Sequence, residues 1–210
     1  MMATGIWRSP AWAGRFRVGI VLAVMPTAAG LAQQPAKRLH LRLDPAATTV
    51  QFSLKDTLHA VHGSFHLSGG DILFDPRSGD AQGKFEVETA SGASGNDSRD
   101  SRMKKEFLEV TRFPVATFEA QKVIAQSGAG FDESAPSQTI SVAGVLTLHG
   151  ASHPMTLQFA VQRNGTQATA ATRFTIPYVS WGIKDPSIPF VHVEKEVTID
   201  VTAKGTLTAE

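Results

Sequence analysis

Alternation of apolar and polar residues, repeated along most of the chain, constrains the fold more than any other feature of this sequence. In residues 39–44, for example, the apolar side chains fall at positions 39, 41 and 43. A strand places successive side chains on opposite faces, so each such run predicts a β-strand with one buried face. The pattern is clearest in the last third of the chain, where the apolar sets are Ile140, Val142, Leu146, Leu148; Met155, Leu157, Phe159, Val161; Phe174, Ile176, Tyr178; and Val197, Ile199, Val201, Ala203.

Eight to ten strands can be counted in this way, and short turns join most of them. Asn164-Gly165 is a strong hairpin signal, because both residues tolerate positive φ. Ser68 to Asp71 reads as another turn, and residues 126–138 read as a long surface loop. Antiparallel strands with one apolar face either close into a barrel or stack as a sandwich. The recurring hairpin spacing, without a clear Greek-key crossover, favours a closed up-and-down β-barrel.

One charged helical segment interrupts the strands between residues 96 and 114. Asn96 or Asp97 can cap its first turn, and Pro114 excludes helical geometry at the preceding residue. Met103, Phe107 and Val110 form one helical stripe. We therefore expect a short helix near residues 97–108 that lies across the mouth of the barrel. Two opposite-charge pairs at i,i+4 spacing would support it, Asp100 with Lys104 and Arg102 with Glu106.

The N-terminal residues have the order of a secretory signal. Three arginines and no acid precede the apolar run 18–32, which ends in small residues, as a signal peptide does. A membrane anchor is the rival interpretation, but the run contains Pro26 and is shorter than the roughly 20 residues that a spanning helix needs. We expect a signal peptide over residues 1–32, a tether over 33–38, and one barrel domain over 39–210. The protein would then be periplasmic or secreted.

Charge and cysteine content exclude several classes of function. The chain has 20 basic and 19 acidic residues. Three of the basic residues lie in the predicted signal, so the mature charge is 17 − 19 = −2. A mildly acidic domain has no general attraction to nucleic acid. The sequence contains no cysteine, which excludes a disulfide framework, a thiolate nucleophile and a Cys-ligated metal.

The sequence offers no pattern of catalytic residues. Its serines lack a GxSxG elbow, its histidines lack an HExxH frame, and no glycine-rich loop stands in a βαβ setting. We therefore expect a protein that is not an enzyme and that has no cofactor. His59, His62 and His66 form the one cluster that could bind a metal, and they are equally well explained as histidines on a solvated face.

The phenylalanines point to a binding function more than to a catalytic one. Six of them would face the barrel interior: Phe52, Phe65, Phe85, Phe118, Phe159 and Phe174. A barrel of about eight strands can hold one small ligand if its inner side chains leave room. Alternation alone does not decide between a filled core and a cavity.

A set of short motifs lies in order along nearly the whole predicted domain. The motifs are Phe74-Asp75-Pro76, Arg99-Asp100, Phe107-Leu108, Phe113-Pro114 with Thr117-Phe118, and residues 144–150, GVLTLHG, followed by Pro154. Together they resemble the YceI-like family of secreted, lipocalin-like proteins. Two departures stand out. Arg102 replaces the family's histidine, and the family's Arg-x-x-Phe-Gly stretch is altered to residues 178–183, YVSWGI.

The resemblance implies a lipocalin-like antiparallel β-barrel whose pore takes a long isoprenoid chain, such as a polyprenyl lipid or a quinone-like amphiphile. Arg99, Arg102 and Lys104 would form a basic rim for its head group, or would lie on a solvated helix face. The expected ligand-binding residues are Phe52, Phe65, Phe85, Arg99, Arg102, Met103, Lys104, Phe107, Phe118, Phe174 and Trp181. The alternative is a stress-related or protein-interaction barrel with a filled core. The expected partner is an amphiphilic small molecule, not nucleic acid, and a homodimer is left open.

Overall fold

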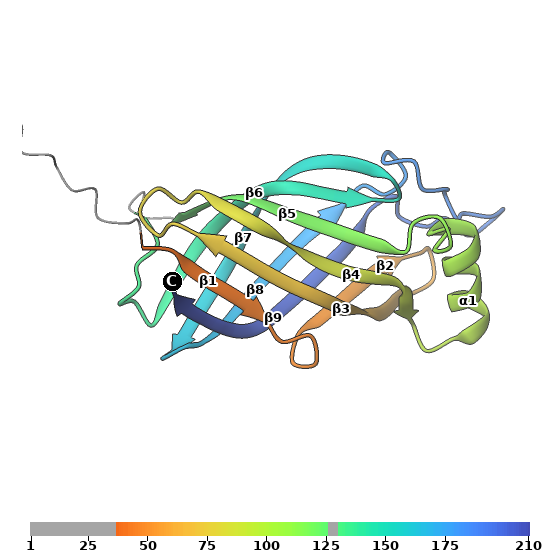
Figure 1. Ribbon diagram of the computed structural model, residues 1–210. Coiled ribbons are helices and arrows are strands. Elements are labelled where there is room, and N and C mark those ends of the chain that lie inside the picture. Colours follow the sequence, from red (N-terminus) through yellow and green to blue (C-terminus); the bar gives the residue numbers. More distant parts are fainter. Residues whose placement is uncertain (1–36, 126–129) are drawn as a thin grey trace, which may run out of the picture. The chain divides into compact units, whose positions relative to one another are not determined.

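The computed structural model describes residues 37–125 and 130–210, which form a nine-stranded antiparallel sheet and a short helix (Figure 1). The strands are β1 (Leu39–Leu43), β2 (Thr49–Lys55), β3 (Ala60–Phe74), β4 (Ala81–Ala93), β5 (Val115–Ala125), β6 (Ser137–Leu148), β7 (Ala151–Asn164), β8 (Gln167–Ile176) and β9 (Val197–Ala209). The helical segment is α1 (Asp97–Arg102), which continues as the wider turn η1 (Met103–Phe107).

The sheet closes into an eight-strand barrel because β1 and β2 lie end to end in one strand position. Both strands pair with β3 on one side and with β9 on the other. All remaining neighbours are consecutive in sequence, from β3 round to β9. The expected up-and-down antiparallel barrel is therefore confirmed. A tight hairpin also joins β7 and β8, but its two turn residues are Gly165 and Thr166, and of the predicted pair Asn164-Gly165 only Gly165 has positive φ.

Between β1 and β2, Thr48 and Asp44 maintain the hydrogen bonding to β9. The side chain of Thr48 accepts a hydrogen bond from the backbone N–H of Lys204 at 3.1 Å, and the backbone N–H of Asp44 donates to the carbonyl of Lys204 at 2.8 Å. Both backbone groups of Lys204 thus keep a partner where the ladder changes from β2 to β1. The barrel stays closed at this point.

The turn expected at residues 68–71 is instead a bend within a continuous strand. β3 runs through it, with irregular register to β4 between Leu67 and Gly69. A side chain at Gly70 would have its Cβ 2.8 Å from Leu43 and 2.9 Å from Phe85. The glycine therefore allows two large inward side chains to meet above the bend, and this contact becomes important for the cavity.

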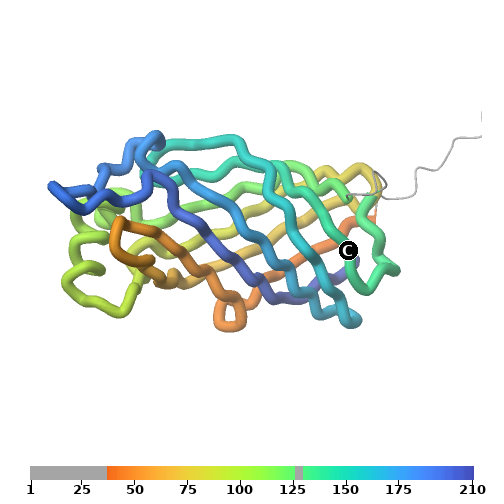
Figure 2. The backbone as a smooth tube through the Cα atoms, turned by 180° about the vertical axis from the view of Figure 1, so that it is seen from behind, coloured from red at the N-terminus to blue at the C-terminus, as the bar shows by residue number. Residues whose placement is uncertain are grey.

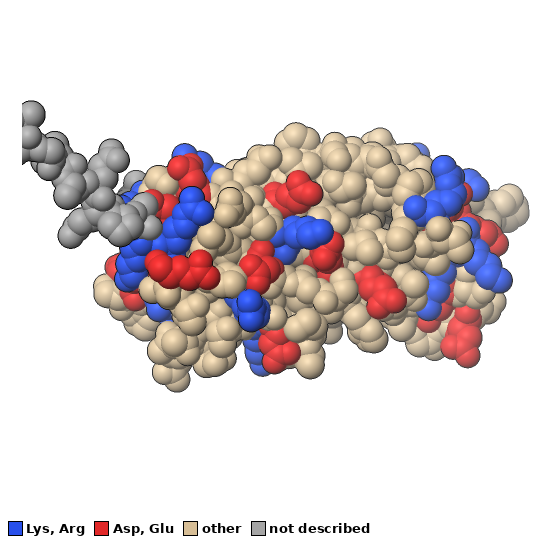
Figure 3. All heavy atoms as spheres, viewed as in Figure 1, with Lys and Arg blue, Asp and Glu red and all other residues tan. Residues whose placement is uncertain are grey.

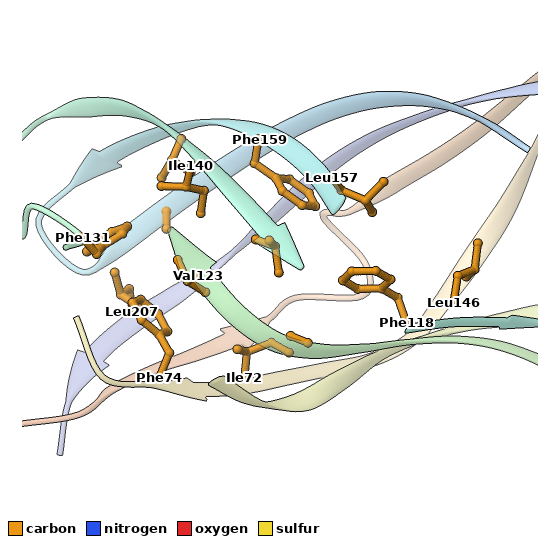
Figure 4. Packing of buried hydrophobic residues seen from close by; sticks show 14 of the residues in the cluster. Ile72, Phe74, Phe118, Val123, Phe131, Ile140, Leu146, Leu157, Phe159 and Leu207 are labelled. Carbon is orange, nitrogen blue, oxygen red and sulfur yellow. The ribbon is translucent and has the colours of Figure 1, made fainter. Parts of the chain in front are cut away.

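One end of the barrel is filled by a compact apolar core. Phe74 packs edge-on against Phe131, with ring centroids 5.2 Å apart, and Figure 4 shows Leu207 beside this pair. Phe131 comes from the segment predicted to be a surface loop, yet it is 7% exposed. Its backbone N–H donates to the carbonyl of Pro76 at 2.7 Å, which fixes the ring in the barrel end. This part of the 126–138 prediction was wrong.

The helix lies at the opposite end of the barrel from the β3–β4 turn and the C-terminus (Figure 1). It begins at the predicted cap, where the Asn96 side chain accepts from the backbone N–H of Arg99 at 2.9 Å. It ends earlier than Pro114 would require, because Glu109 turns into the left-handed region at φ 44°. Val110 consequently lies beyond the helix, while Met103 and Phe107 keep the predicted stripe. Within the described residues this is the only helical segment.

Candidate functional site

The half of the barrel nearer the helix contains an apolar cavity of about 700 Å³. Its wall is made by the inward side chains of the strands, and α1 and η1 border its mouth. On β2, buried Val50 and Phe52 alternate with exposed Thr49 and Gln51, which is the period-two pattern of the sequence. The alternation thus places the apolar residues on the cavity wall and the polar residues in solvent.

Six inward-facing phenylalanines were predicted, and the structure places all six on this wall. Phe52 and Phe65 meet at a ring-centroid distance of 5.3 Å. Deeper in the barrel, Phe85 and Phe118 stack almost in parallel with their centroids 6.2 Å apart. Phe159 and Phe174 complete the set. Gly63 lies opposite Phe52 in the β2–β3 ladder, and a Cβ there would be 2.4 Å from its ring. This glycine makes room for the ring.

A floor of apolar side chains separates the cavity from a smaller void of about 60 Å³ in the filled end. Residues that line both spaces make up this floor: Leu41, Leu43, Phe85, Ile140, Val142, Ala170 and Ala203. Phe85 is the largest of them, and it rests with Leu43 over Gly70. The floor therefore sets the depth of the cavity.

At the mouth, Ser94 ties the start of the helix to the end of β4. Its backbone N–H donates to both carboxylate oxygens of Asp100 at 3.0 Å, and its hydroxyl also donates to Asp100. Arg99 donates from Nε to the Ser94 hydroxyl at 2.7 Å and from Nη2 to the Ser94 carbonyl at 2.9 Å. Asp100 and Arg99 thus position the helix by binding the same serine.

The charge state of Asp100 follows from these contacts. Burial raises the pKa of its carboxyl, but the hydrogen bonds from Ser94 and the nearby charges of Arg99 and Lys104 lower it by more, so the net pKa is below the ordinary value. Asp100 is 8% exposed. It is therefore a buried, ionised anchor of the helix, and its predicted pairing with Lys104 is replaced by the bonds to Ser94.

Four cationic side chains and one carboxylate line the mouth: Lys55, Arg99, Arg102, Lys184 and Asp56. Arg102 makes the predicted pair with Glu106 at 3.5 Å and lies over the ring of Phe107 at 5.9 Å. Arg99 and Arg102 thus take their predicted places at the rim. Lys55 and Lys184 were missed, because Lys55 ends β2 and Lys184 lies in the loop between β8 and β9, so both are distant from the helix in sequence and only barrel closure brings them to it.

Two of the eleven expected ligand-binding residues lie outside the cavity wall. Lys104 does not line the cavity, although Met103 and Phe107 on the same segment η1 do. Its side chain leaves η1 in a different direction from theirs. Trp181 follows β8 and stacks on His153, with centroids 3.7 Å apart and planes 5° from parallel. In place of Trp181, the altered 178–183 stretch contributes Tyr178 and Ile183 to the wall.

Tyr178 adds apolar surface to the wall without a free hydroxyl. Its O–H donates to the carbonyl of Glu194 at 2.7 Å. Burial, together with the charge of Asp185, raises the pKa of Tyr178 to about 12. The phenol therefore stays neutral at physiological pH. A different polar atom, Oγ1 of Thr172, is buried on the wall and has no hydrogen-bond partner among the described residues.

The histidine cluster lies outside the barrel. His62 and His66 share the exposed face of β3, and His62 Nδ1 is 2.9 Å from the hydroxyl of Ser53. His59 is also exposed, in the turn before β3. Across residues 37–125 and 130–210, no group of three or more His, Asp or Glu side chains is arranged to hold a metal ion. Nor does any helix in these two stretches have the length and apolar character needed to cross a membrane.

Fold and site together define an antiparallel β-barrel that is filled at one end and hollow at the other, with a helix at the open mouth. The sequence matches the model of the YceI-like domain over residues 41–205. The protein therefore belongs to the YceI-like family, as its motifs indicated.

Relatives and solved structures agree with this membership. A UPF0312 protein of Pseudomonas syringae pv. tomato is 27% identical over 153 residues, which cover 69% of this chain and 73% of the relative. A UPF0312 protein of Yersinia pestis is 31% identical over 119 residues, or 55% of this chain and 57% of the relative. The chain thus spans little more than half the length of that Yersinia relative.

Two solved structures have the same fold. BcnA of Burkholderia cenocepacia superposes with a TM-score of 0.63 at 22% identity, covering 77% of this chain and 98% of that one. A Saccharophagus degradans domain, described as a polyisoprenoid binding domain implicated in plant cell wall breakdown, gives 0.62 at 17% identity, covering 80% and 98%.

Proposed function

We propose that this protein binds the chain of an isoprenoid-type lipid, such as a polyprenyl or quinone-like amphiphile, in the hollow half of its barrel. The observation that carries the proposal is the cavity of about 700 Å³ with a wall of aromatic and aliphatic side chains. Burial of each isoprene unit contributes roughly 1–2 kcal/mol at about 25 cal/mol per Å². Several units are therefore enough for tight binding.

The shape of the site supports a carrier more than an enzyme. The wall is apolar and has one open end, so a linear chain can enter while its polar end stays among the charged side chains at the mouth. Arg99 and Arg102 stand there with Lys55 and Lys184, where they can meet a head group. The alternative, a protein-interaction barrel, requires a filled core, and only the end of the barrel away from the helix is filled.

Lipid analysis of the purified protein tests the proposal. The full chain is expressed with its own leader, purified, and its bound lipids are extracted and identified by mass spectrometry. We expect a stoichiometric amphiphile with an isoprenoid chain. Delipidated protein should also take up an offered fluorescent prenol. Finding no bound amphiphile and no prenol uptake would contradict the proposal.

A matched pair of variants shows whether uptake uses the cavity. Thr172 faces the cavity, and Thr175 lies exposed on the outer face of the same strand. Thr172→Phe should fill the cavity and abolish uptake, and Thr175→Phe should leave it intact. Thermal unfolding of both variants checks that they are folded.

We also propose that residues 1–32, which lie outside the described residues, direct export to the periplasm or the medium, and that the exported barrel works without a resident cofactor or metal and without nucleic acid. Cell fractionation with and without residues 1–32 tests export.

Metal analysis of the purified protein tests whether the barrel works without a metal, since a stoichiometric ion would contradict this. Sedimentation velocity decides between a monomer and a homodimer.

A further inference from the structure

The most exposed large hydrophobic side chains of the described residues lie in two loops. Phe190 is 94% exposed, Leu58 is 73% and Ile188 is 55%. Leu58 belongs to the turn between β2 and β3, and the other two belong to the loop before β9. Single exposed apolar residues are ordinary, but an aromatic ring and two aliphatic side chains on joined loops form a surface feature. We call these three residues the apolar tip.

The backbone holds the apolar tip in place. Ile188 and Val191 exchange two backbone hydrogen bonds, at 3.0 and 3.1 Å, and so form a tight turn around Pro189 and Phe190. Phe190 has φ 71°, a conformation that bulky residues rarely adopt. A positive φ at the apex of a hydrogen-bonded turn fixes the direction of the side chain, so the exposure of this ring is built into the loop.

Hydrogen bonds also join the two loops. The backbone N–H of Thr57 donates to the carbonyl of His192 at 3.0 Å, and the N–H of His192 donates to the Thr57 hydroxyl at 3.0 Å. The N–H of Glu194 donates to the carbonyl of Lys55 at 2.9 Å. In Figure 2 the blue loop that carries Phe190 projects past the barrel at the end where the helix lies. The two loops that carry the apolar tip are therefore joined to each other at that end.

The loops that carry the apolar tip also build the mouth of the cavity. Lys55, Lys184, Pro186 and Val193 line it, and each lies within four residues of a tip residue in sequence. The charged groups lining the mouth are four cations, completed by Arg99 and Arg102, and one acid, Asp56. Acidic and basic side chains are mixed on the outer surface at this end (Figure 3). The charged side chains that line the mouth therefore carry an excess of positive charge.

An apolar surface next to cationic side chains fits the interface of an anionic lipid bilayer. Aromatic and aliphatic side chains enter the boundary between head groups and acyl chains, while Lys and Arg bind anionic head groups. We propose that the apolar tip docks the barrel on an anionic bilayer with the cavity mouth facing the lipid. Docking in this orientation goes beyond ligand binding and would let an apolar chain pass between bilayer and cavity without crossing water.

Vesicle sedimentation of the delipidated full-length protein, with residues 1–32 removed if export cleaves them, tests docking without any assumption about the ligand. The probes are vesicles of phosphatidylcholine alone and of phosphatidylcholine with phosphatidylglycerol. The tip variant is Leu58→Ser, Ile188→Ser, Phe190→Ser. The control variant is Val115→Ser, Ile124→Ser, which removes the two other exposed large hydrophobics, 38% and 45% exposed.

We expect the wild type and the control variant to bind the anionic vesicles, and the tip variant to bind at least about tenfold more weakly. Phe190→Gly is a second test, because glycine accepts the positive φ and cannot unfold the turn. It should also weaken vesicle binding while the melting temperature stays the same or rises. Equal vesicle binding by the wild type and both tip variants would overturn the proposal.

Two further outcomes separate this proposal from its alternatives. If the tip substitutions leave vesicle binding unchanged and dissociate a dimer in sedimentation velocity, the tip binds a second copy of the chain and the proposal is wrong. Transfer of a fluorescent prenol to acceptor vesicles should become faster as vesicle concentration rises, because docking makes transfer collisional. If vesicles bind through the tip but no prenol is taken up, docking stands and the proposed ligand fails.

Discussion

The two ends of this barrel use the same strands in different ways. At the filled end, Phe74, Phe131 and Leu207 pack together and leave a void of only about 60 Å³. At the hollow end, Phe52 and Phe65 come from the same kind of alternating strand but face a space of about 700 Å³. The difference teaches that alternation determines where a side chain points, whereas the opposing side chains determine whether the space is filled.

The largest expected effect is a difference in the stability lost when a phenylalanine is removed from each end. Phe74 is 4% exposed and packs against Phe131, so Phe74→Ala should cost about 3–5 kcal/mol of unfolding free energy through lost transfer energy and a new cavity. Phe65 already borders an open space, so Phe65→Ala should cost only about 1–2 kcal/mol, without the cavity term. Urea unfolding measures both, and equal costs would contradict the distinction between the ends.

Phe85→Ala should weaken the boundary between the ends. Removing this ring from the floor joins the cavity to the smaller void, so the longest prenol that binds tightly should gain about one isoprene unit, at a cost of about 2–3 kcal/mol in stability. Ala170→Leu adds bulk to the same floor and should shorten the preferred chain. Affinities for a series of prenols of increasing length measure the limit. An unchanged limit in both variants would show that this floor does not set ligand length.

A smaller effect is expected where the helix is anchored at the hollow end. Asp100→Asn should cost about 1–2 kcal/mol, because a charged acceptor of the Ser94 hydrogen bonds is lost. The folded-state pKa of Asp100 lies below its ordinary 3.8. Its stabilising contribution is therefore complete above pH 3.8 and is lost as pH falls through the lower folded-state pKa.

Acid unfolding of Asp100→Asn should accordingly be less steep than that of the wild type in this pH range. Asp97→Asn, an exposed position in the first turn of the same helix, serves as the control and should behave like the wild type. Identical acid profiles for Asp100→Asn and the wild type would remove Asp100 from the role of anchor.

The smallest effect concerns a single hydroxyl in the hollow half. Thr172 Oγ1 has no hydrogen-bond partner among the described residues, so Thr172→Val should raise stability by about 1 kcal/mol by removing a buried, unpaired polar atom. Thr175→Val on the outer face should change stability little. A loss of stability in Thr172→Val would indicate that the hydroxyl is bound in the folded protein.

Much of the barrel could be predicted from its sequence. Period-two alternation gave the inward direction of Phe52, Phe85 and Phe174, and the capping residue Asn96 gave the start of the helix. These signals are local, and neighbouring residues are enough to produce them. The shared strand position of β1 and β2 was not visible, because it depends on the pairing of β9 with both.

The limits of prediction follow from long-range contacts. Alternation could not distinguish the filled end from the hollow one, since the volume left inside depends on residues from all strands. Phe131 fills one end of the barrel, but it belongs to an irregular segment in which no alternation of apolar residues could indicate its burial. Lys184 reaches the mouth only because its loop is hydrogen-bonded to the β2–β3 turn through Thr57 and His192. Trp181 had a promising place in an altered family motif, but its ring stacks on His153 outside the cavity.

Photo-crosslinking of a bound prenol tests the central claim most directly. A prenol with a photoreactive group on its chain is bound to the delipidated protein, irradiated, and its attachment sites are mapped by peptide mass spectrometry. We predict attachment at residues of the hollow half, such as Phe52, Phe65 and Phe107, and none at Phe74, Phe131 or Leu207. Attachment at the filled end, or only at the outer surface of the barrel, would contradict the claim that the hollow half holds the ligand.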